Sequence, residues 1–285
     1  MDTINKWRHS AAGRVSIMLV LVSIFLLFLA WSPLGIGFLT VDEANFANNV
    51  LIGLATNLIG IVVTVSFVQY FLDRQNEVKE RKEENEKILR YNKYMQTLIR
   101  RYLVFYMSLT TRIADRKEAG DVDKAFTHTF KLSDMADMYQ TSLFLTEGFS
   151  DSTIELYYKA EYELRNYMLK MLENIEFKYN TELAGLLLDF TVKSIDLDMS
   201  GQMLERAKMK KYGNGKKDIE YIEKMIADEK YDWIGKFGRG ELQGNLMLPY
   251  VILYYTCQEQ VGMIKKYTEY IKNIEKVDNK EHRTK

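Results

Sequence analysis

The stretch VLIGLATNLIGIVVTVSFVQYFL, residues 50–72, decides how the rest of this chain is organised. It contains no charged side chain, and as a helix it would extend about 35 Å, enough to cross the roughly 30 Å hydrocarbon core of a bilayer. The segment DRQNEVKERKEENEK, residues 73–87, follows directly, with acids and bases at helical spacings. No Gly or Pro lies between Ile61 and Ala119. We therefore predict one long helix that begins in a membrane and continues as a charged stalk.

This helix is expected to regain an apolar face after the stalk. Apolar side chains recur there at steps of three and four, so they share one side of the helix. They are Ile88, Tyr91, Met95, Leu98, Tyr102, Phe105 and Leu109. We predict that this apolar seam packs against the rest of the protein. The long helix is expected to run to about Ile113 and to be broken after Ala119 at the latest, because Gly120 follows.

A second apolar run, VSIMLVLVSIFLLFLAW, begins at Val15. A cleaved signal peptide is the alternative to a membrane span, because a basic start and an apolar run are common to both. The run is longer than the apolar core of a typical signal peptide, and no clear small-x-small cleavage site follows it. We therefore predict a transmembrane hairpin over residues 15–72, with spans at about 15–32 and 50–72 and a short external connector.

The positions of Lys and Arg predict the orientation of this hairpin, because bases near a span are retained in the cytoplasm. The tail of residues 1–14 holds Lys6, Arg8 and Arg14, and the stalk is also rich in bases. The connector of residues 33–49 has only Asp42 and Glu43 as charged side chains. We expect a multi-pass protein of the cell inner membrane with both termini cytoplasmic.

Composition favours a helical chain throughout. The sequence has two Pro residues, long runs rich in Leu, Met, Lys, Glu and Tyr, and no convincing pair of alternating strands. Its 39 basic and 39 acidic side chains balance, so no overall field recruits nucleic acid or acidic substrates. The single Cys257 excludes an intrachain disulfide and fits a reducing compartment. We predict an all-α membrane protein, with the hairpin, a helical stalk and apolar seam over residues 73–119, and a cytoplasmic helical domain over residues 120–285.

Motifs of catalysis are missing from this sequence. It has no GxxxxGK[ST] phosphate loop, no HExxH, no GxSxG, and no GxGxxG between a strand and a helix. His9, His128 and His282 have no Cys or carboxylate at metal-ligand spacing. We expect a protein that is not an enzyme and that uses no cofactor or metal ion.

Small and polar residues share one face of the second span. Gly53, Asn57, Gly60 and Thr64 recur at steps of four, three and four, with Thr56 beside them. One interpretation is packing against the first span of the same hairpin, because small residues let helices approach closely. The other is that copies of this helix surround a shared axis, where Asn57 and Thr64 line a pore. The sequence alone leaves both interpretations open.

Two stretches of the cytoplasmic domain suggest a site for an anion. The basic cluster RAKMKKYGNGKK, residues 206–217, has six bases and no acid, and the glycine segment GKFGRGELQG, residues 235–244, has four glycines. Glycine permits close approach to an anion, bases neutralise phosphate, and an aromatic ring can stack on a nucleobase. The alternative is a solvated basic turn and an ordinary glycine loop. The predicted ligand-binding residues are Arg206, Lys208, Lys210, Lys211, Lys216, Lys217, Lys236, Phe237 and Arg239.

In its layout of short tail, two spans, charged stalk and helical cytoplasmic domain, the chain resembles the two-span membrane effectors of bacterial anti-phage defence, found in nucleotide-signalling, CRISPR-associated and Hailong-type systems. This resemblance implies a homo-oligomer whose cytoplasmic domain senses a nucleotide or oligonucleotide and whose spans permeabilise the inner membrane. The expected function is therefore a gated membrane effector or channel. The alternative is a membrane-anchored scaffold whose helical domain binds a partner protein encoded nearby.

Overall fold

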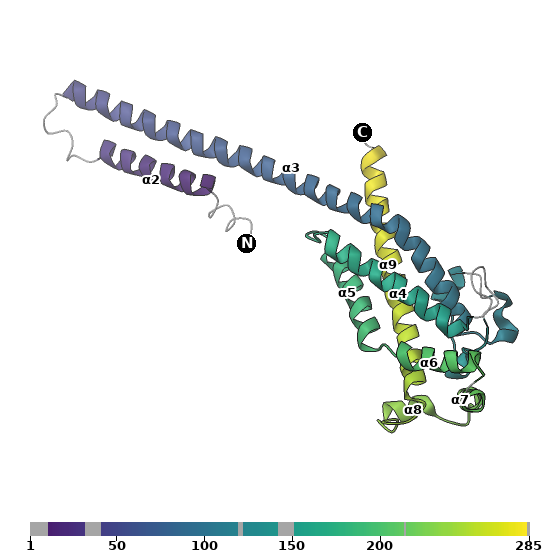
Figure 1. The fold of residues 1–285 in the computed structure, drawn as a ribbon. Helices are drawn as coiled ribbons and strands as arrows, with labels where there is room; N and C mark the ends of the chain where they lie inside the picture. Colours follow the sequence, from purple (N-terminus) through teal and green to yellow (C-terminus); the bar gives the residue numbers. More distant parts are fainter. Residues whose placement is uncertain (1–10, 32–40, 119–121, 142–150, 214, 284–285) are drawn as a thin grey trace. The chain divides into compact units, whose positions relative to one another are not determined.

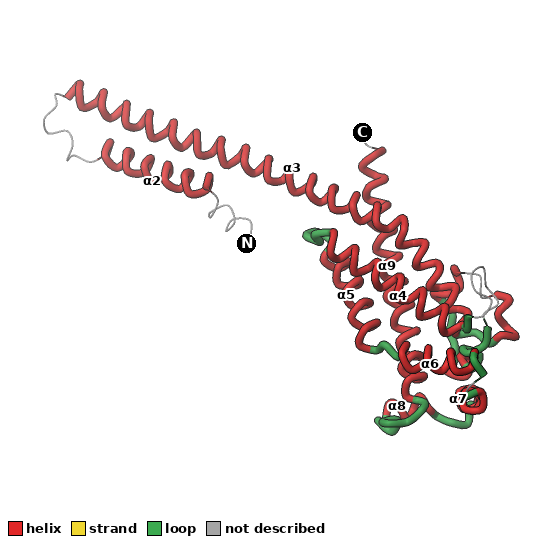
Figure 2. The backbone as a smooth tube through the Cα atoms, viewed as in Figure 1, coloured by secondary structure: helices red, strands yellow, loops and turns green. Residues whose placement is uncertain are grey.

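The computed structural model of the protein describes residues 11–31, 41–118, 122–141, 151–213 and 215–283. These residues form helices joined by turns, as predicted, and the only strand-like feature among them is an isolated bridge between Thr141 and Ser152 (Figure 2). The chain divides into two compact units, Met1–Arg81 and Lys82–Lys285. Helix α3 (Val41–Leu109) contributes to both units.

The first unit contains α2 (Ala11–Trp31) and the first part of α3, which run antiparallel beside each other (Figure 1). Both helices are long and apolar enough to cross a membrane. Helix α3 begins earlier than the predicted span, so residues 41–49 of the predicted connector are helical. Asp42 and Glu43 lie in its first turn, where carboxylates favour the helix dipole. Residues 1–10 of the predicted tail and residues 33–40 of the connector lie outside the described residues.

In the second unit, the predicted apolar seam of α3 lies in the hydrophobic core. The members Ile88, Met95, Tyr102 and Leu109 are fully buried. The helix then ends at Leu109, four residues before the predicted end at about Ile113. Residue Asp137 accounts for the early end, because its carboxylate accepts a hydrogen bond from the Ile113 amide at 2.9 Å and pairs with the Arg112 guanidinium at 3.2 Å. Gly120 lies outside the described residues.

Short 3₁₀ helices follow α3, namely η2 (Ile113–Glu118), η3 (Val122–Phe126) and η4 (Leu132–Met135). Helix α4 (Thr153–Asn174) begins with Ser152 as its N-cap, and the Glu155 carboxylate accepts a hydrogen bond from the Ser152 amide at 2.7 Å. This capping box stabilises the first turn. Helix α5 (Thr181–Asp196) packs against α4.

The remaining helices are α6 (Ser200–Lys211), α7 (Lys216–Ala227), α8 (Trp233–Gly238) and α9 (Leu248–Arg283). Helix α9 contacts α5, α8, η3 and η4, so it forms the centre of the second unit. Hydrogen bonds fix it to other elements: Tyr267 donates its hydroxyl to Asn92 Oδ1 of α3 at 3.0 Å, and Tyr270 donates to Asn180 Oδ1 at 3.0 Å. Pro249 lies in the first turn of α9, where its missing N–H costs no hydrogen bond.

A buried carboxylate connects α3 to the start of α5. Glu84, only 6% exposed, accepts hydrogen bonds from the backbone amides of Lys178, Tyr179 and Asn180 at 3.1, 3.0 and 2.9 Å. It also accepts one from Asn180 Nδ2 at 2.8 Å. These amides lie at and just before the N-cap of α5. Backbone N–H groups at the start of a helix have no hydrogen-bond partner within it, and they attract negative charge. The charged stalk predicted for residues 73–87 therefore includes one acid that is buried within the second unit.

Candidate functional site

The side of α3 that faces α2 is marked by small buried residues. Ala55 is fully buried on α3, and Ser16, Ser23 and Ala30 are buried at steps of seven along α2. Five half-buried residues of α3 lie on the same side as Ala55, and they are Leu51, Leu58, Val62, Ser66 and Gln69. The small side chains of Ala55, Ser16, Ser23 and Ala30 let the two helices approach closely. The packing between α2 and α3 therefore uses these residues, and not the face of Gly53, Asn57, Gly60 and Thr64 that was considered for it.

The predicted small and polar face of α3 points away from α2. At about 100° per residue, Gly60 lies about 140° and Thr64 about 180° around the helix from Ala55. Thr56, Asn57, Gly60 and Thr64 are exposed, and Gly53 is half-buried. A Cβ atom added to Gly53 or Gly60 would meet no atom within 4 Å. Contacts among the described residues therefore do not require glycine, in place of a larger residue, at either position.

Hydrogen bonds of this face are made within α3 itself. The Thr56 hydroxyl donates to the carbonyls of Ile52 and Gly53 at 2.9 and 3.0 Å, and the Thr64 hydroxyl donates to that of Gly60 at 2.9 Å. Among the described residues, none forms a hydrogen bond with the side-chain amide of Asn57. An amide in hydrocarbon is stabilised by a partner on another helix. The face thus presents one free amide between two glycines.

The basic cluster is largely paired within the second unit. Lys210 forms a half-buried ion pair with Glu223 at 2.6 Å, while Lys211 pairs with Asp151 at 3.4 Å and Lys216 with Glu220 at 4.0 Å. Its bases lie on α6 and on α7, and Gly213 and Gly215 in the turn between these helices adopt φ values of 79° and 70°. Sequence analysis missed these acidic partners because the acids lie outside the basic stretch.

The other three bases of the cluster, Arg206, Lys208 and Lys217, form no ion pair with a carboxylate of the described residues. Arg206 donates a hydrogen bond to the Tyr250 hydroxyl at 2.8 Å, and that hydroxyl lies 2.7 Å from the Tyr139 hydroxyl. Arg206 therefore ties α6 to α9. Lys208 and Lys217 are exposed, and neither forms an ion pair with a described residue. These two lysines are the part of the predicted anion site that remains open to a ligand.

The glycine segment differs from the predicted loop, because its first residues form the end of α8. Phe237 packs against Tyr255 with ring centroids 5.4 Å apart, and Arg239 pairs with Glu241 at 2.6 Å. The Lys236 ammonium lies 5.0 Å above the centre of the Trp233 ring. Contacts within the chain thus occupy all three predicted ligand residues of this segment.

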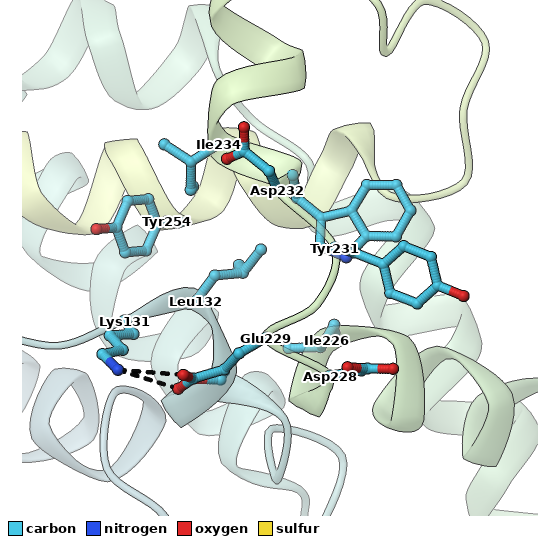
Figure 3. A pocket seen from close by; sticks show the side chains of 11 residues that line it. Lys131, Leu132, Ile226, Asp228, Glu229, Tyr231, Asp232, Ile234 and Tyr254 are labelled. Atoms are coloured by element: carbon cyan, nitrogen blue, oxygen red, sulfur yellow. Dashed lines mark hydrogen bonds and ion pairs between the residues drawn. The ribbon is translucent and has the colours of Figure 1, made fainter.

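A cavity of about 300 Å³ lies between η4, the end of α7, the start of α8 and α9 (Figure 3). We call it the α7–α8 cavity. Its apolar surface comes from Leu132, Ile226, Ile234, Trp233 and Tyr254. The Trp233 indole is held in place because its Nε1 donates to the Met225 carbonyl at 3.0 Å. The Tyr231 ring stacks on it, with centroids 5.1 Å apart and planes inclined by 23°.

Carboxylates dominate the rim of this cavity. Asp228, Glu229 and Asp232 line it together with a single base, Lys131. The Lys131 ammonium pairs with Glu229 at 3.1 Å, and both side chains are open to solvent, at 71% and 62% exposure. The hydrogen bond from Lys131, followed by that from Ser133, lowers the pKa of the Glu229 carboxyl, so this group is ionised at neutral pH. The predicted anion-binding residues line no part of this cavity.

Sequence analysis missed the α7–α8 cavity, although a local signal was present. The run DEKYDW, residues 228–233, alternates acids with aromatic residues and supplies most of the rim. Lys131 and Leu132 come from a segment almost one hundred residues earlier. Only the fold brings these two parts together.

A hydrogen-bonded group occupies the centre of the second unit. Gln260 Oε1 accepts hydrogen bonds from the hydroxyls of Tyr102 and Tyr157 at 2.7 and 2.8 Å, and Gln260 Nε2 donates to Ser194 Oγ at 2.8 Å. Burial raises the pKa of the Cys257 thiol to about 12 and the pKa values of both tyrosines well above their ordinary value. A thiol held protonated is a poor nucleophile. This group therefore links α3, α4, α5 and α9 and offers no reactive thiolate.

Metal-ligand geometry is not found in the part of the chain that the structure describes, where no group of three His, Cys, Asp or Glu side chains could hold a metal ion. His128 Nε2 lies 3.2 Å from the Thr110 carbonyl oxygen, and the His128 ring stacks on Phe130.

Comparisons with protein-family models, with curated proteins and with solved structures found no match to this chain.

Proposed function

We propose that this protein is a two-span membrane protein that assembles through α3 into an oligomeric effector or channel of the cell inner membrane, controlled by its helical second unit. The observation that carries the proposal is the direction of the small and polar face. Gly53 and Gly60 have open space where a Cβ would be, and the face that they share with Asn57 and Thr64 points away from α2. A face of this kind fits close contact with other copies of the same helix.

Energetics favour a partner for this face. Glycine within a helix destabilises it by about 0.5–1 kcal/mol relative to alanine. Because no contact within the described residues requires Gly53 or Gly60, we infer that contact with another molecule compensates for this cost. A second copy would provide one, because backbones meet closely at glycine and the Asn57 amide can donate to its symmetry mate. Large apolar side chains are also exposed on α2 and on this part of α3, including Phe28, Val63 and Phe67, which fits contact with lipid.

Control by the second unit would act through α3. This helix is continuous from Val41 to Leu109 and belongs to both units, so a change in packing around its seam would act on the helix that also carries the span. In this proposal both termini are cytoplasmic, and a nucleotide or oligonucleotide binds near Lys208 and Lys217. A role in anti-phage defence rests on the resemblance in layout alone.

Cysteine crosslinking in native membranes tests the assembly. Asn57→Cys introduces a thiol on the proposed contact face, and the natural Cys257 gives little background because it is buried. Ile59→Cys is the matched control, since it lies at nearly the same depth but about 200° around the helix from Asn57. We expect crosslinked dimers with Asn57→Cys and few with Ile59→Cys. Equal crosslinking at both positions would contradict the proposed face.

Ion leakage tests the channel. Asn57→Leu and Thr64→Leu make the span more apolar, so insertion is retained while the lining of a conduit changes. We expect altered ion leakage from vesicles that contain either variant. A membrane-anchored scaffold would show normal membrane levels and unchanged leakage in both variants, and that result would favour the alternative function.

A further inference from the structure

Two features of the α7–α8 cavity point to a ligand that is positively charged and partly apolar. Its rim holds three carboxylates and one ammonium, and its floor is formed by aromatic and aliphatic side chains such as Trp233, Tyr254 and Leu132. In Figure 3, Asp232 and Glu229 lie on opposite sides of the cavity, with Leu132 between them. Two anionic ends separated by an apolar surface are complementary to a chain with an ammonium at each end.

Lysines of the protein itself already show how an ammonium is held at this place. Lys131 Nζ lies 3.1 and 3.3 Å from the two oxygens of Glu229, and Lys236 Nζ lies 5.0 Å above the centre of the Trp233 ring. The first is a charge-assisted hydrogen bond and the second is a cation–π contact. Exposed ion pairs of this kind are weak in water, so a ligand with two or more ammonium groups can displace Lys131.

The Asp232 carboxylate has one oxygen that can accept a hydrogen bond from a ligand. Its Oδ1 accepts the Gly235 amide at 2.9 Å as the cap of α8, while its Oδ2 lies 3.6 Å from Arg239 Nη1. This second contact is longer than a hydrogen bond, and Asp232 is itself solvent-exposed. An incoming ammonium can therefore bind Oδ2 without removing the cap.

We propose that the α7–α8 cavity binds an aliphatic polyamine, with ammonium groups at Glu229 and Asp232 and its alkyl chain on Leu132 and Tyr254. Polyamines combine spaced positive charges with flexible apolar segments, which is the pattern that this cavity presents. The inference does not depend on the assembly of α3 or on the nucleotide site. Its failure would leave the proposed function intact.

Calorimetric titration of the full-length protein in a neutral detergent at low salt, with spermidine as the probe, tests the proposal. We expect saturable binding with quenching of tryptophan emission, because Trp233 lines the cavity. Glu229→Gln should weaken binding about tenfold through loss of a charge-assisted hydrogen bond. Lys131→Gln should instead strengthen it, because this variant removes the competing ammonium.

Glu220→Gln is the matched control, because Glu220 is an exposed carboxylate of α7 that pairs with Lys216 and lines no part of the cavity. The affinity of this variant for spermidine should equal that of the unaltered protein. Absence of saturable binding, or equal weakening by Glu229→Gln and Glu220→Gln, would overturn the proposal. Displacement of spermidine by an equal concentration of Mg²⁺ would also overturn it, since the cavity would then respond to charge alone. Binding of an oligolysine peptide without binding of spermidine would assign the cavity to a protein partner instead.

Discussion

Replacement of Glu84 by alanine should destabilise the second unit strongly. The carboxylate accepts hydrogen bonds from three backbone amides and from Asn180 Nδ2, all between 2.8 and 3.1 Å. Lys178 and Tyr179 are open enough for water to replace the carboxylate, whereas Asn180 is buried. A hydrogen bond to a charged group contributes about 1.5–3 kcal/mol, so the two donors of Asn180 alone predict a loss of about 3–6 kcal/mol.

The change can be measured by urea unfolding of the full-length protein in detergent, with amide hydrogen exchange as a local readout. Glu84→Ala should lower the free energy of unfolding of the second unit and speed exchange over residues 178–184. Glu84→Gln keeps one acceptor oxygen but loses the charge, so it should cost about 1–2 kcal/mol. Glu86→Ala is the control, because Glu86 lies nearby on α3 and is exposed, with only a 3.9 Å ion pair to Lys82.

An exposed pair of that kind contributes at most about 1 kcal/mol. If Glu84→Ala cost no more than Glu86→Ala and left exchange over residues 178–184 unchanged, the carboxylate would not hold the start of α5. The reasoning from buried donors would then be refuted.

Three further predictions address topology, pH dependence and ligand binding. Reporter fusions at Asn45 and after Lys285 should give an external and a cytoplasmic signal, and the reverse at either position would disprove the hairpin orientation. Burial raises the pKa of the Glu161 carboxyl above its ordinary 4.5, so the folded state favours its protonated form and stability falls as pH rises through the raised pKa. Glu161→Gln should thus stabilise the protein at neutral pH and have little effect below pH 4.5. Urea unfolding at a series of pH values measures this effect, and a difference in the free energy of unfolding that did not change with pH would contradict it. Lys208→Glu combined with Lys217→Glu should weaken binding of a nucleotide or short single-stranded oligonucleotide in low-salt calorimetry, and no binding to a panel of both would remove the ligand hypothesis.

The ion pairs of the basic cluster could not be predicted from the sequence. The sequence identified a basic cluster without acids, because local charge density is visible along the chain. It did not show that Lys210 meets Glu223 or that Lys211 meets Asp151. Charge reversal at Lys210 would therefore place two carboxylates together and destabilise α6 and α7, which makes Lys210 unsuitable for a binding test.

From sequence alone, the helices, the two long apolar segments and the buried seam of α3 could be identified. Each of these depends on nearest neighbours along the chain: helical hydrogen bonds join residues four apart, and apolar residues at steps of three and four mark a buried face.

Only the tertiary structure decided which faces meet and which charges are paired. It directed Ala55 toward α2 and the face of Gly60 and Asn57 away from it, a choice that the spacing of small residues leaves open. It also ended α3 at Leu109 through contacts with Asp137, and it formed the α7–α8 cavity from segments far apart in sequence. The physical reason is that these outcomes depend on how close distant side chains come in the packed chain, and periodicity within a single helix carries no information about that distance.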